Sequence, residues 1–253
     1  MVIHFPVEIT IGRLSVPLHA VMETAGFFIG FRYFLYLRKR QTDSIETTNR
    51  MMIILGAIFG SLLGSRLIGG LENPEQLLSA SNKLLYFYTN KTVVGGFLGG
   101  LFGVEAIKKA IGEKQSSGDL FVFPMLLALI IGRIGCFSMG IYEETYGNVT
   151  TPPWGMNLGD GMSRHPVSLY EMVFLIALWI GLVQLEKRRK LLSGARFKLF
   201  MVAYLLFRLL LDIIKPHYYT VIPFSVIQLT CIAGLLYYYK VLLNPKKQLF
   251  YRQ

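Results

Sequence analysis

The chain has 253 residues, of which 53% are hydrophobic and only 16% are charged, and its mean hydropathy is +0.48. This composition excludes an ordinary soluble domain and indicates an integral membrane protein. The formal net charge of +11 would suit a nucleic-acid partner, but the positions of the basic residues, described below, argue against that interpretation.

Apolar windows follow one another along the whole chain, and most reach the ~20 residues that a helix needs to cross ~30 Å of hydrocarbon. They run over residues 15–36, 51–70, 92–107, 119–140, 167–185, 197–214 and 224–243. The window that begins at Thr92 is the shortest. Because Arg38, Lys39 and Arg40 follow the first window as a stop-transfer pattern, no cleavable signal is expected. We therefore predict one all-α membrane domain, residues 1–253, with about seven transmembrane helices.

The basic residues are distributed unevenly between the loops. Of the 26 Lys and Arg residues, 17 lie in alternate loops, at residues 38–50, 108–114, 187–198 and 240–252. The opposite loops, at residues 71–91, 141–166 and 215–223, are poor in basic residues. This asymmetry predicts that the N-terminus is outside and the C-terminus is in the cytoplasm. The basic runs are expected to contact anionic lipids and to fix the topology rather than to bind nucleic acid.

The longest outer loop, residues 141–166, is rich in Pro, Gly and Asn. These residues predict an ordered small head made of turns, without a helix. Elsewhere, glycines four residues apart in the first three windows predict close packing of neighbouring helices. The exception is "VVGGFLGG" at residues 93–100, where doubled glycines leave little side chain on either side of the helix and favour a groove for an acyl chain.

Ionisable residues recur at similar depth, in the outer half of the predicted spans. They are His19, Glu23, Arg66, Arg133, Glu171, Arg208 and Asp212. Such groups are costly in a membrane and are kept for pairing, for a water-filled cavity or for a ligand. Two explanations stay open: structural ion pairs, with Arg208 on Asp212 and with Glu171 on Arg66 or Arg133, or a phosphate head group bound by the arginines. The second explanation is favoured.

The remaining His and Cys residues carry weaker signals. His165 precedes Pro166 and is open to a simple role in a turn, and His217 is expected at the interface. Cys136 and Cys231 make no disulfide framework. Because no Cys or His pair has the spacing of metal ligands, neither a metal site nor a cofactor is expected.

The motifs of this chain, taken in order, resemble those of the prolipoprotein diacylglyceryl transferase family. "GRIGCF" at residues 132–137 resembles the family's G-R-x-G-N-F, and "RHPVSLYE" at 164–171 resembles H-P-x-Q-L-Y-E. "FRLLLD" at 207–212, "GSRLIG" at 64–69 and "VVGGFLGG" are similar to R-x-x-x-E, G-x-R-L-x-Y and H-G-G-L-x-G-G. Each match is weak alone, but together they span nearly the whole chain.

The resemblance implies a multi-pass protein of the bacterial inner membrane with seven helices and a small periplasmic head. It implies transfer of diacylglycerol from phosphatidylglycerol to the lipobox cysteine of a preprolipoprotein signal peptide, by a monomer without cofactors. Arg133 and Arg208 would hold the lipid phosphate. The other substrate-binding residues that it implies are Arg66, Gly95, Gly96, His165, Tyr170, Glu171 and Asp212.

Several positions depart from the family pattern. Cys136 stands where the family has Asn, Val94 stands where it has His, and His19 aligns with its Tyr. Glu143 or Glu144 takes the place of a downstream Glu, with Gly147 as the closing Gly. We therefore expect His19 or a loop carboxylate to deprotonate the thiol.

Two other functions remain in view. A divergent family member would bind phospholipid or transfer its lipid to another acceptor, which the substitutions at residues 94 and 136 favour. A lipid or anion transporter would predict inverted repeats or paired broken helices, and neither is visible in the sequence.

Overall fold

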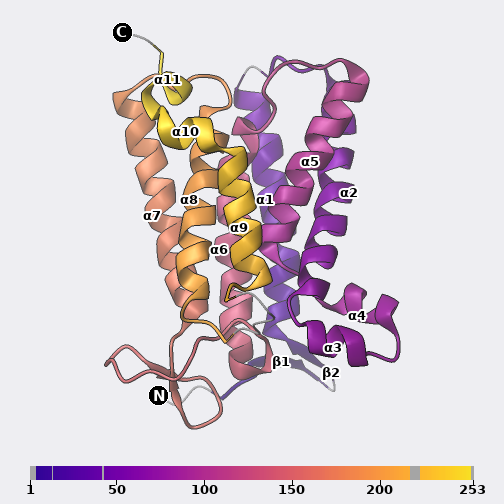
Figure 1. Ribbon diagram of the computed structural model, residues 1–253, viewed down its shortest axis with the longest axis vertical. Helices are drawn as coiled ribbons and strands as arrows, with labels where there is room; N and C mark the ends of the chain where they lie inside the picture. The colour runs from indigo at the N-terminus through magenta and orange to yellow at the C-terminus, as the bar shows by residue number, and fades with distance from the viewer. Residues whose placement is uncertain (1–3, 13, 42, 217–222, 252–253) are drawn as a thin grey trace.

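The protein is described by a computed structural model that covers residues 1–253 except 1–3, 13, 42, 217–222 and 252–253. Long helices run side by side between two ends of the molecule, and short elements gather at the end where the N-terminus lies (Figure 1). The long helices are α1 (Leu18–Arg40), α2 (Thr47–Leu71), α5 (Val93–Ile111), α6 (Val122–Met139), α7 (Val167–Arg188), α8 (Ala195–Asp212) and α9 (Val226–Tyr237). Two short helices, α10 (Tyr239–Leu243) and α11 (Pro245–Leu249), follow at the other end.

Each predicted apolar window coincides with one long helix, and the last window also includes α10. The 3-10 turn η1 (Asp119–Phe121) leads into α6, so the window from residue 119 is one continuous helical segment. Among the described residues, three helical segments are long and apolar enough to cross a membrane, namely Thr47–Leu71, Asp119–Tyr142 and Val167–Arg188. The prediction of a mostly helical membrane protein is thereby confirmed.

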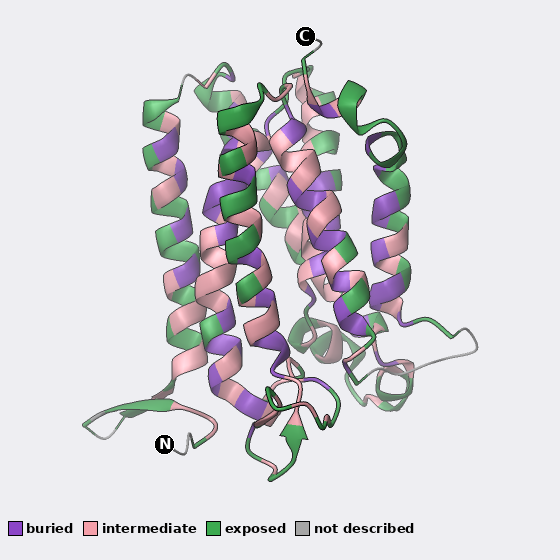
Figure 2. Ribbon diagram, turned by 90° about the vertical axis from the view of Figure 1, so that its left-hand side faces the viewer, coloured by how far each residue is buried: buried purple, intermediate pink, exposed green. Residues whose placement is uncertain are grey.

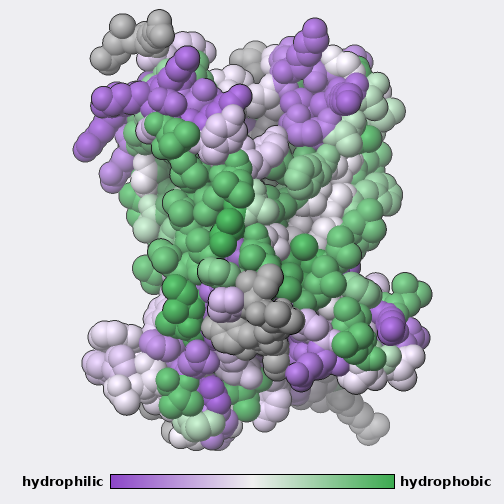
Figure 3. All heavy atoms as spheres, viewed as in Figure 1, coloured by the Kyte–Doolittle hydropathy of each residue, from purple (hydrophilic) through white to green (hydrophobic). Residues whose placement is uncertain are grey.

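The outside of the bundle is apolar. On the face that Figure 3 shows, hydrophobic residues form a wide band across the middle of the molecule, and hydrophilic residues gather at its upper end. Exposed side chains on the long helices include Phe27, Phe28, Phe59, Leu63, Val173 and Leu210. Along each helix, exposed residues alternate with buried residues that face the interior (Figure 2). An apolar belt of this extent is typical of a surface that lipid covers.

Glycines bring α2 and α5 into backbone contact. A Cβ atom added at Gly60 would overlap the carbonyl oxygen of Gly99, and one added at Gly64 would overlap that of Gly95. Small residues at four-residue spacing allow this close approach, as expected from the sequence. The doubled glycines do not leave both sides of α5 open, because Gly95 and Gly99 face α2; a Cβ at Gly96 would meet nothing closer than Ser65 Cβ at 3.7 Å.

The buried core fixes α8 relative to α6. Phe200 and Tyr204 of α8 are fully buried and pack edge-to-face against Phe97 of α5, at 5.3 and 5.0 Å between ring centroids. At the start of α8, the Asp119 carboxylate accepts backbone hydrogen bonds from Gly194 at 2.6 Å and Phe197 at 2.9 Å. Because η1 leads directly into α6, these contacts fix the position of α8 along the axis of α6, and with it the depth of the functional residues of α8.

Short elements fold over the end of the bundle that carries the N-terminus. They are the antiparallel hairpin of β1 (Glu8–Ile11) and β2 (Leu14–Pro17), the helices α3 (Pro74–Ser79) and α4 (Lys83–Thr89), the 3-10 turn η2 (Gly140–Tyr142), and the pair of β3 (Met156–Asn157) with β4 (Ser163–Arg164). Residues 141–166 form turns and strands without an α-helix, as their composition predicted. The two helices α3 and α4 were not predicted.

Candidate active site

A buried ion pair joins α6 to α7. Arg133 Nε lies 2.9 Å from Glu171 Oε1, and the Glu171 side chain is only 1% exposed. The Tyr204 hydroxyl of α8 donates a hydrogen bond to the same carboxylate oxygen at 2.8 Å. Of the two partners that the sequence left open for Glu171, the structure therefore selects Arg133, and three helices meet at one carboxylate.

Arg208 of α8 lies close to this carboxylate but is not paired with it. Its charge acts on both Glu171 and Tyr204, and the residue is 9% exposed. Within the described residues, Arg208 makes neither an ion pair within 4.0 Å nor a hydrogen bond. A guanidinium group carries N–H donors that need hydrogen-bond acceptors when the group is buried. The Arg208 guanidinium is therefore available to bind an anionic ligand.

Asp212 does not form the pair with Arg208 that the spacing of four residues favoured. Its carboxylate instead accepts a hydrogen bond from the Ser225 hydroxyl. Ser225 is also the N-cap of α9, where its hydroxyl oxygen accepts from Gln228 N and the Gln228 side chain accepts from Ser225 N. Asp212 thus ties the end of α8 to the start of α9, and the Arg208 side chain is left without a partner on its own helix.

Two further charged residues lie next to this pair of arginines. Burial raises the pKa of Glu72 at the end of α2, and burial together with the Arg208 charge lowers the pKa of Lys215 to about 8. The charges of these residues interact with each other and with Asp212. Sequence inspection missed both residues because they lie just beyond the apolar windows. Tyr204 was missed because an aromatic residue in a membrane helix gives no polar signal.

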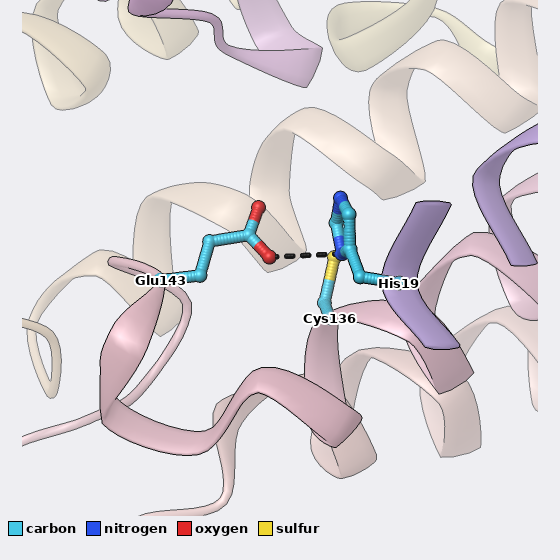
Figure 4. Close-up of side chains that lie close together, drawn as sticks. All are labelled: His19, Cys136 and Glu143. Carbon is cyan, nitrogen blue, oxygen red and sulfur yellow. Dashed lines mark ion pairs between the residues drawn. The ribbon is translucent and has the colours of Figure 1, made fainter. Parts of the chain in front are cut away.

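A second cluster brings together His19 from α1, Cys136 from α6 and Glu143, which follows η2. Their side chains point toward one another (Figure 4). His19 Nδ1 lies 3.0 Å from Glu143 Oε2, and the three donor atoms all lie within 4.8 Å of one another. Arg133 Nη1 donates to Cys136 Sγ at 3.4 Å, which places this cluster beside the arginines. His, Cys and Glu side chains are ligand types that bind transition metals.

The outer edge of this cluster holds the His19 ring in place. His19 Nε2 lies 3.5 Å from Glu23 Oε2, one turn along α1. Lys91 Nζ lies 2.6 Å from the other oxygen of Glu23. Both nitrogens of the imidazole therefore face carboxylates, which fixes the orientation of the ring.

The other residues singled out in the sequence are spread around these two clusters. Arg66 lies over the ring of Tyr88 in α4, 5.1 Å from the ring centroid. His165 Nδ1 lies 3.1 Å from the hydroxyl of Tyr170, and Gly147 N donates to the carbonyl oxygen of His165. Gly95 packs against α2, as described above. The negative charge of Glu144 lies close enough to repel that of Glu72. His217 lies outside the described residues.

Comparison with known proteins decides the family. The family model for prolipoprotein diacylglyceryl transferase matches residues 6–243. The chain belongs to the prolipoprotein diacylglyceryl transferase family. A relative from Nitratidesulfovibrio vulgaris strain DP4, named phosphatidylglycerol–prolipoprotein diacylglyceryl transferase, is 31% identical over 83% of this chain and 81% of its own length. A relative of the same name from Wolbachia pipientis subsp. Culex pipiens strain wPip is 36% identical over 68% of this chain and 66% of its own.

Within the diacylglyceryl transferase family, a further relative from Bordetella parapertussis carries the same name and is 30% identical over 82% of this chain and 80% of its own length. The chain is therefore similar to these proteins over most of its length, and the match to the family model includes all the long helices. The family resemblance noted in the sequence is confirmed, and the chain is assigned to the transferases.

Proposed function

We propose that this protein is a phosphatidylglycerol–prolipoprotein diacylglyceryl transferase, as its relatives are named. It takes diacylglycerol from phosphatidylglycerol and attaches it to the lipobox cysteine of a preprolipoprotein. The single observation that carries this proposal is the meeting of two buried guanidinium groups, Arg133 and Arg208, around one carboxylate, with Arg208 left unpaired among the described residues. Guanidinium groups bind phosphate oxygens through two parallel hydrogen bonds and stay charged at any accessible pH.

In the proposed site, the arginine cluster and the cluster of His19, Cys136 and Glu143 have separate roles. Arg133 and Arg208 hold the phosphate, while Glu171, Tyr204 and Asp212 keep these side chains in place. As the bond between glycerol carbon and phosphate oxygen breaks, the electron pair leaves with glycerol phosphate, and the arginines stabilise that charge.

The attacking group is the thiolate of the lipobox cysteine, which forms the new carbon–sulfur bond. A free thiol has a pKa near ~8.5, so it has to be deprotonated to react well. We assign this step to the cluster of His19, Cys136 and Glu143, which lies next to Arg133. Holding lipid and thiol between two fixed clusters also supplies positioning.

The remaining candidate residues are placed at the border of the site. Arg66, half-buried beside Tyr88, is proposed to contact the lipid head group. The pair of His165 and Tyr170 and the neighbouring Glu144 are proposed to contact the peptide, because the segment 141–166 covers this end of the bundle. Gly95 and Gly96 are proposed to let an acyl chain pass along α5, on the side where a Cβ atom at Gly96 would meet only Ser65 and Ser61, at 3.7 and 3.9 Å.

The proposed setting is the bacterial inner membrane, crossed by all seven long helices of a monomer. The hydrophilic end in Figure 3 includes the basic residues at the end of α1, α5 and α7, which supports a cytoplasmic location for the C-terminus. The site lies at the opposite end of the bundle, so the proposal places it, with the N-terminus and residues 141–166, on the periplasmic side.

Complementation tests this proposal in cells. A bacterial strain whose own transferase can be depleted is expected to grow when it expresses this chain, and to lose growth when it expresses Arg208→Gln at equal membrane abundance. Cys231→Ser, which alters a buried thiol of α9 and leaves the named hydrogen bonds and ion pairs of both clusters in place, is the matched control and is expected to support growth. If wild-type protein reaches the membrane and binds phosphatidylglycerol yet fails to support growth, the acceptor is a different molecule and the proposal is wrong.

A further inference from the structure

The cluster of His19, Cys136 and Glu143 carries an inference about how the thiol is activated. We infer that these three side chains form a binding site for one divalent transition-metal ion, of which zinc is the best match, and that the ion coordinates the substrate thiol. This inference rests on the proposed function for the identity of the thiol, but the binding of the ion stands on geometry alone.

The donor atoms have the arrangement that a tetrahedral ion requires. A zinc ion binds His nitrogen at about 2.0–2.1 Å, carboxylate oxygen at about 2.0–2.2 Å and thiolate sulfur at about 2.3 Å. Donor atoms on such an ion are then roughly 3.3–3.6 Å apart, by the same bond lengths. The three donors here lie within 4.8 Å of one another, with His19 Nδ1 and Glu143 Oε2 at 3.0 Å. Small side-chain movements therefore bring all three onto one ion.

Two of these donors face each other as an ion pair that lacks hydrogen-bond geometry. His19 Nδ1 and Glu143 Oε2 are buried from solvent, and neither makes a hydrogen bond of acceptable geometry within the described part of the chain, although they lie 3.0 Å apart. Buried polar atoms of this kind call for a water or an ion. An ion between them would satisfy both through bonds to the nitrogen and oxygen lone pairs.

The groups around the donors match those that support metal ligands. A ligating histidine usually directs its second ring nitrogen to a carboxylate, and His19 Nε2 faces Glu23 Oε2 at 3.5 Å. Glu23 is in turn held by Lys91 at 2.6 Å. On the sulfur side, Arg133 Nη1 donates a hydrogen bond to Cys136 Sγ at 3.4 Å, which orients the sulfur atom.

The charges favour a divalent cation. As metal ligands, a neutral His19, a Cys136 thiolate and a Glu143 carboxylate would together carry two negative charges, which one divalent ion would neutralise. Lys91 is paired with Glu23, and Arg133 is shared between Glu171 and Cys136, so these two cations offset only part of the negative charge of the donors. The nitrogen, sulfur and oxygen donor set favours zinc over magnesium or calcium, which prefer oxygen ligands.

The site leaves one position for a further ligand. The side chains of His19 and Glu143 are 18% and 27% exposed, so the cluster is open on one side. Three protein ligands with an open fourth position are typical of catalytic zinc rather than structural zinc. A substrate thiol bound there gives its proton to water and becomes a thiolate, which attacks the glycerol carbon as described above. The ion keeps its oxidation state throughout.

This role differs from the role of base that the sequence indicated for His19. A histidine bound to the ion through Nδ1 cannot take the proton of the thiol. The three donors come from two helices and a loop, at residues 19, 136 and 143, so no local spacing in the sequence pointed to the site.

Metal analysis of the full chain in detergent tests the inference directly. The protein, purified with a tag that lacks histidine, is treated with a chelator, dialysed against zinc and analysed by elemental mass spectrometry. One zinc per chain is expected for wild type and for Cys231→Ser, and no zinc for Cys136→Ser or His19→Gln. With cobalt in place of zinc, wild type and Cys231→Ser are expected to show a thiolate-to-metal charge-transfer band in the near ultraviolet that Cys136→Ser lacks.

A second variant separates loss of the site from loss of the fold. Glu23→Gln keeps the three ligands and is expected to weaken zinc binding by roughly 10- to 100-fold, because it removes the carboxylate partner of His19. Size-exclusion profiles and thermal unfolding of each variant show whether it is folded. Equal zinc binding by wild type, Cys136→Ser and His19→Gln, or no zinc on wild type, would overturn the inference.

The two proposals fail in different ways. If chelated, zinc-free protein transfers diacylglycerol at the full rate, the transferase assignment holds and the metal inference is wrong. If the protein binds zinc through these residues but never modifies a lipobox peptide, the metal site holds and the assignment of the substrate is wrong.

Discussion

Arg133 and Glu171 form a buried ion pair across α6 and α7, with Nε and Oε1 2.9 Å apart. The same carboxylate oxygen accepts a hydrogen bond from Tyr204. Arg208 lies close enough for its charge to act on this carboxylate, yet it has no ion pair of its own in the described part of the chain. The Glu171 carboxylate is therefore the counter-charge for two guanidinium groups. A bound phosphate would neutralise the excess positive charge.

Variants of this pair separate a structural role from phosphate binding. Glu171→Gln leaves Arg133 buried without its counter-charge, and we expect it to lower the free energy of unfolding by about 3–5 kcal/mol. The double variant Arg133→Gln with Glu171→Gln has the same net charge at this site as the wild type and is expected to regain much of that stability, measured by thermal unfolding in detergent. It is nevertheless expected to be inactive. A stable double variant with wild-type activity would show that the pair is only structural.

Lys215 is expected to make binding of the proposed phospholipid donor sensitive to pH. Burial, together with Arg208, lowers its pKa to about 8, so its positive charge is present below that pH and is lost as the pH rises through it. We expect the KM for phosphatidylglycerol to rise above pH 8 in the wild type. Lys215→Arg, whose guanidinium stays charged, should move this rise to higher pH. An identical pH profile in the two proteins would exclude Lys215 from the head-group site.

Much of the fold was predictable from the sequence, because membrane spans leave a strong local signal. All the apolar windows became long helices, and the glycines at four-residue spacing did place α2 against α5. The helices α3 and α4 were not predicted. Each is only six or seven residues long and begins at an Asn cap, at Asn73 and Asn82, which is a short signal inside a polar loop.

The sequence predicted most of the charged residues that belong to the candidate site, but not which of them pair with each other. The charged layer and both central arginines were identified, since ionisable groups are conspicuous in apolar helices. The choice between Arg66 and Arg133 as the partner of Glu171 depends on which helices are neighbours, and the sequence does not contain that information directly. For the same reason, the approach of His19, Cys136 and Glu143 was not foreseen, because these residues lie on three different elements.

The contact between α2 and α5 should tolerate no side chain at its glycines. In Gly99→Ala the added methyl group meets the backbone of Gly60, which cannot move away as a side chain would. We expect a loss of about 1–3 kcal/mol in the free energy of unfolding. Gly181→Ala in α7, where a Cβ atom meets nothing within 4 Å, is the matched control and should be neutral or slightly stabilising. Equal melting temperatures for Gly99→Ala and wild type would contradict the close helix contact.

The loop between α1 and α2 should make the free energy of unfolding depend on pH in the acidic range. Burial alone would raise the pKa of Asp43, but hydrogen bonds from Arg50 and Arg38 outweigh it and lower the pKa. The stabilisation is therefore complete above the unfolded pKa of about 3.9 and is lost as the pH falls through the lower folded value. Asp43→Asn should cost about 2–3 kcal/mol at neutral pH.

Thermal unfolding of Asp43→Asn and wild type between pH 3 and pH 7 measures this effect. The difference between the two proteins is expected to be largest at neutral pH and to shrink as the pH falls below about 4. A difference that is constant over the whole range would show that the Asp43 charge contributes no stability.

The most direct test of the account is the mass of a lipobox peptide incubated with phosphatidylglycerol and the purified protein. We predict that the peptide gains one diacylglyceryl group on its cysteine, with release of glycerol phosphate. We also predict that Arg208→Gln slows the reaction by roughly 10²- to 10³-fold, whereas Cys231→Ser does not. A peptide of unchanged mass, or an Arg208→Gln variant as fast as wild type, would contradict the claim that these arginines bind the phosphate of a diacylglycerol donor.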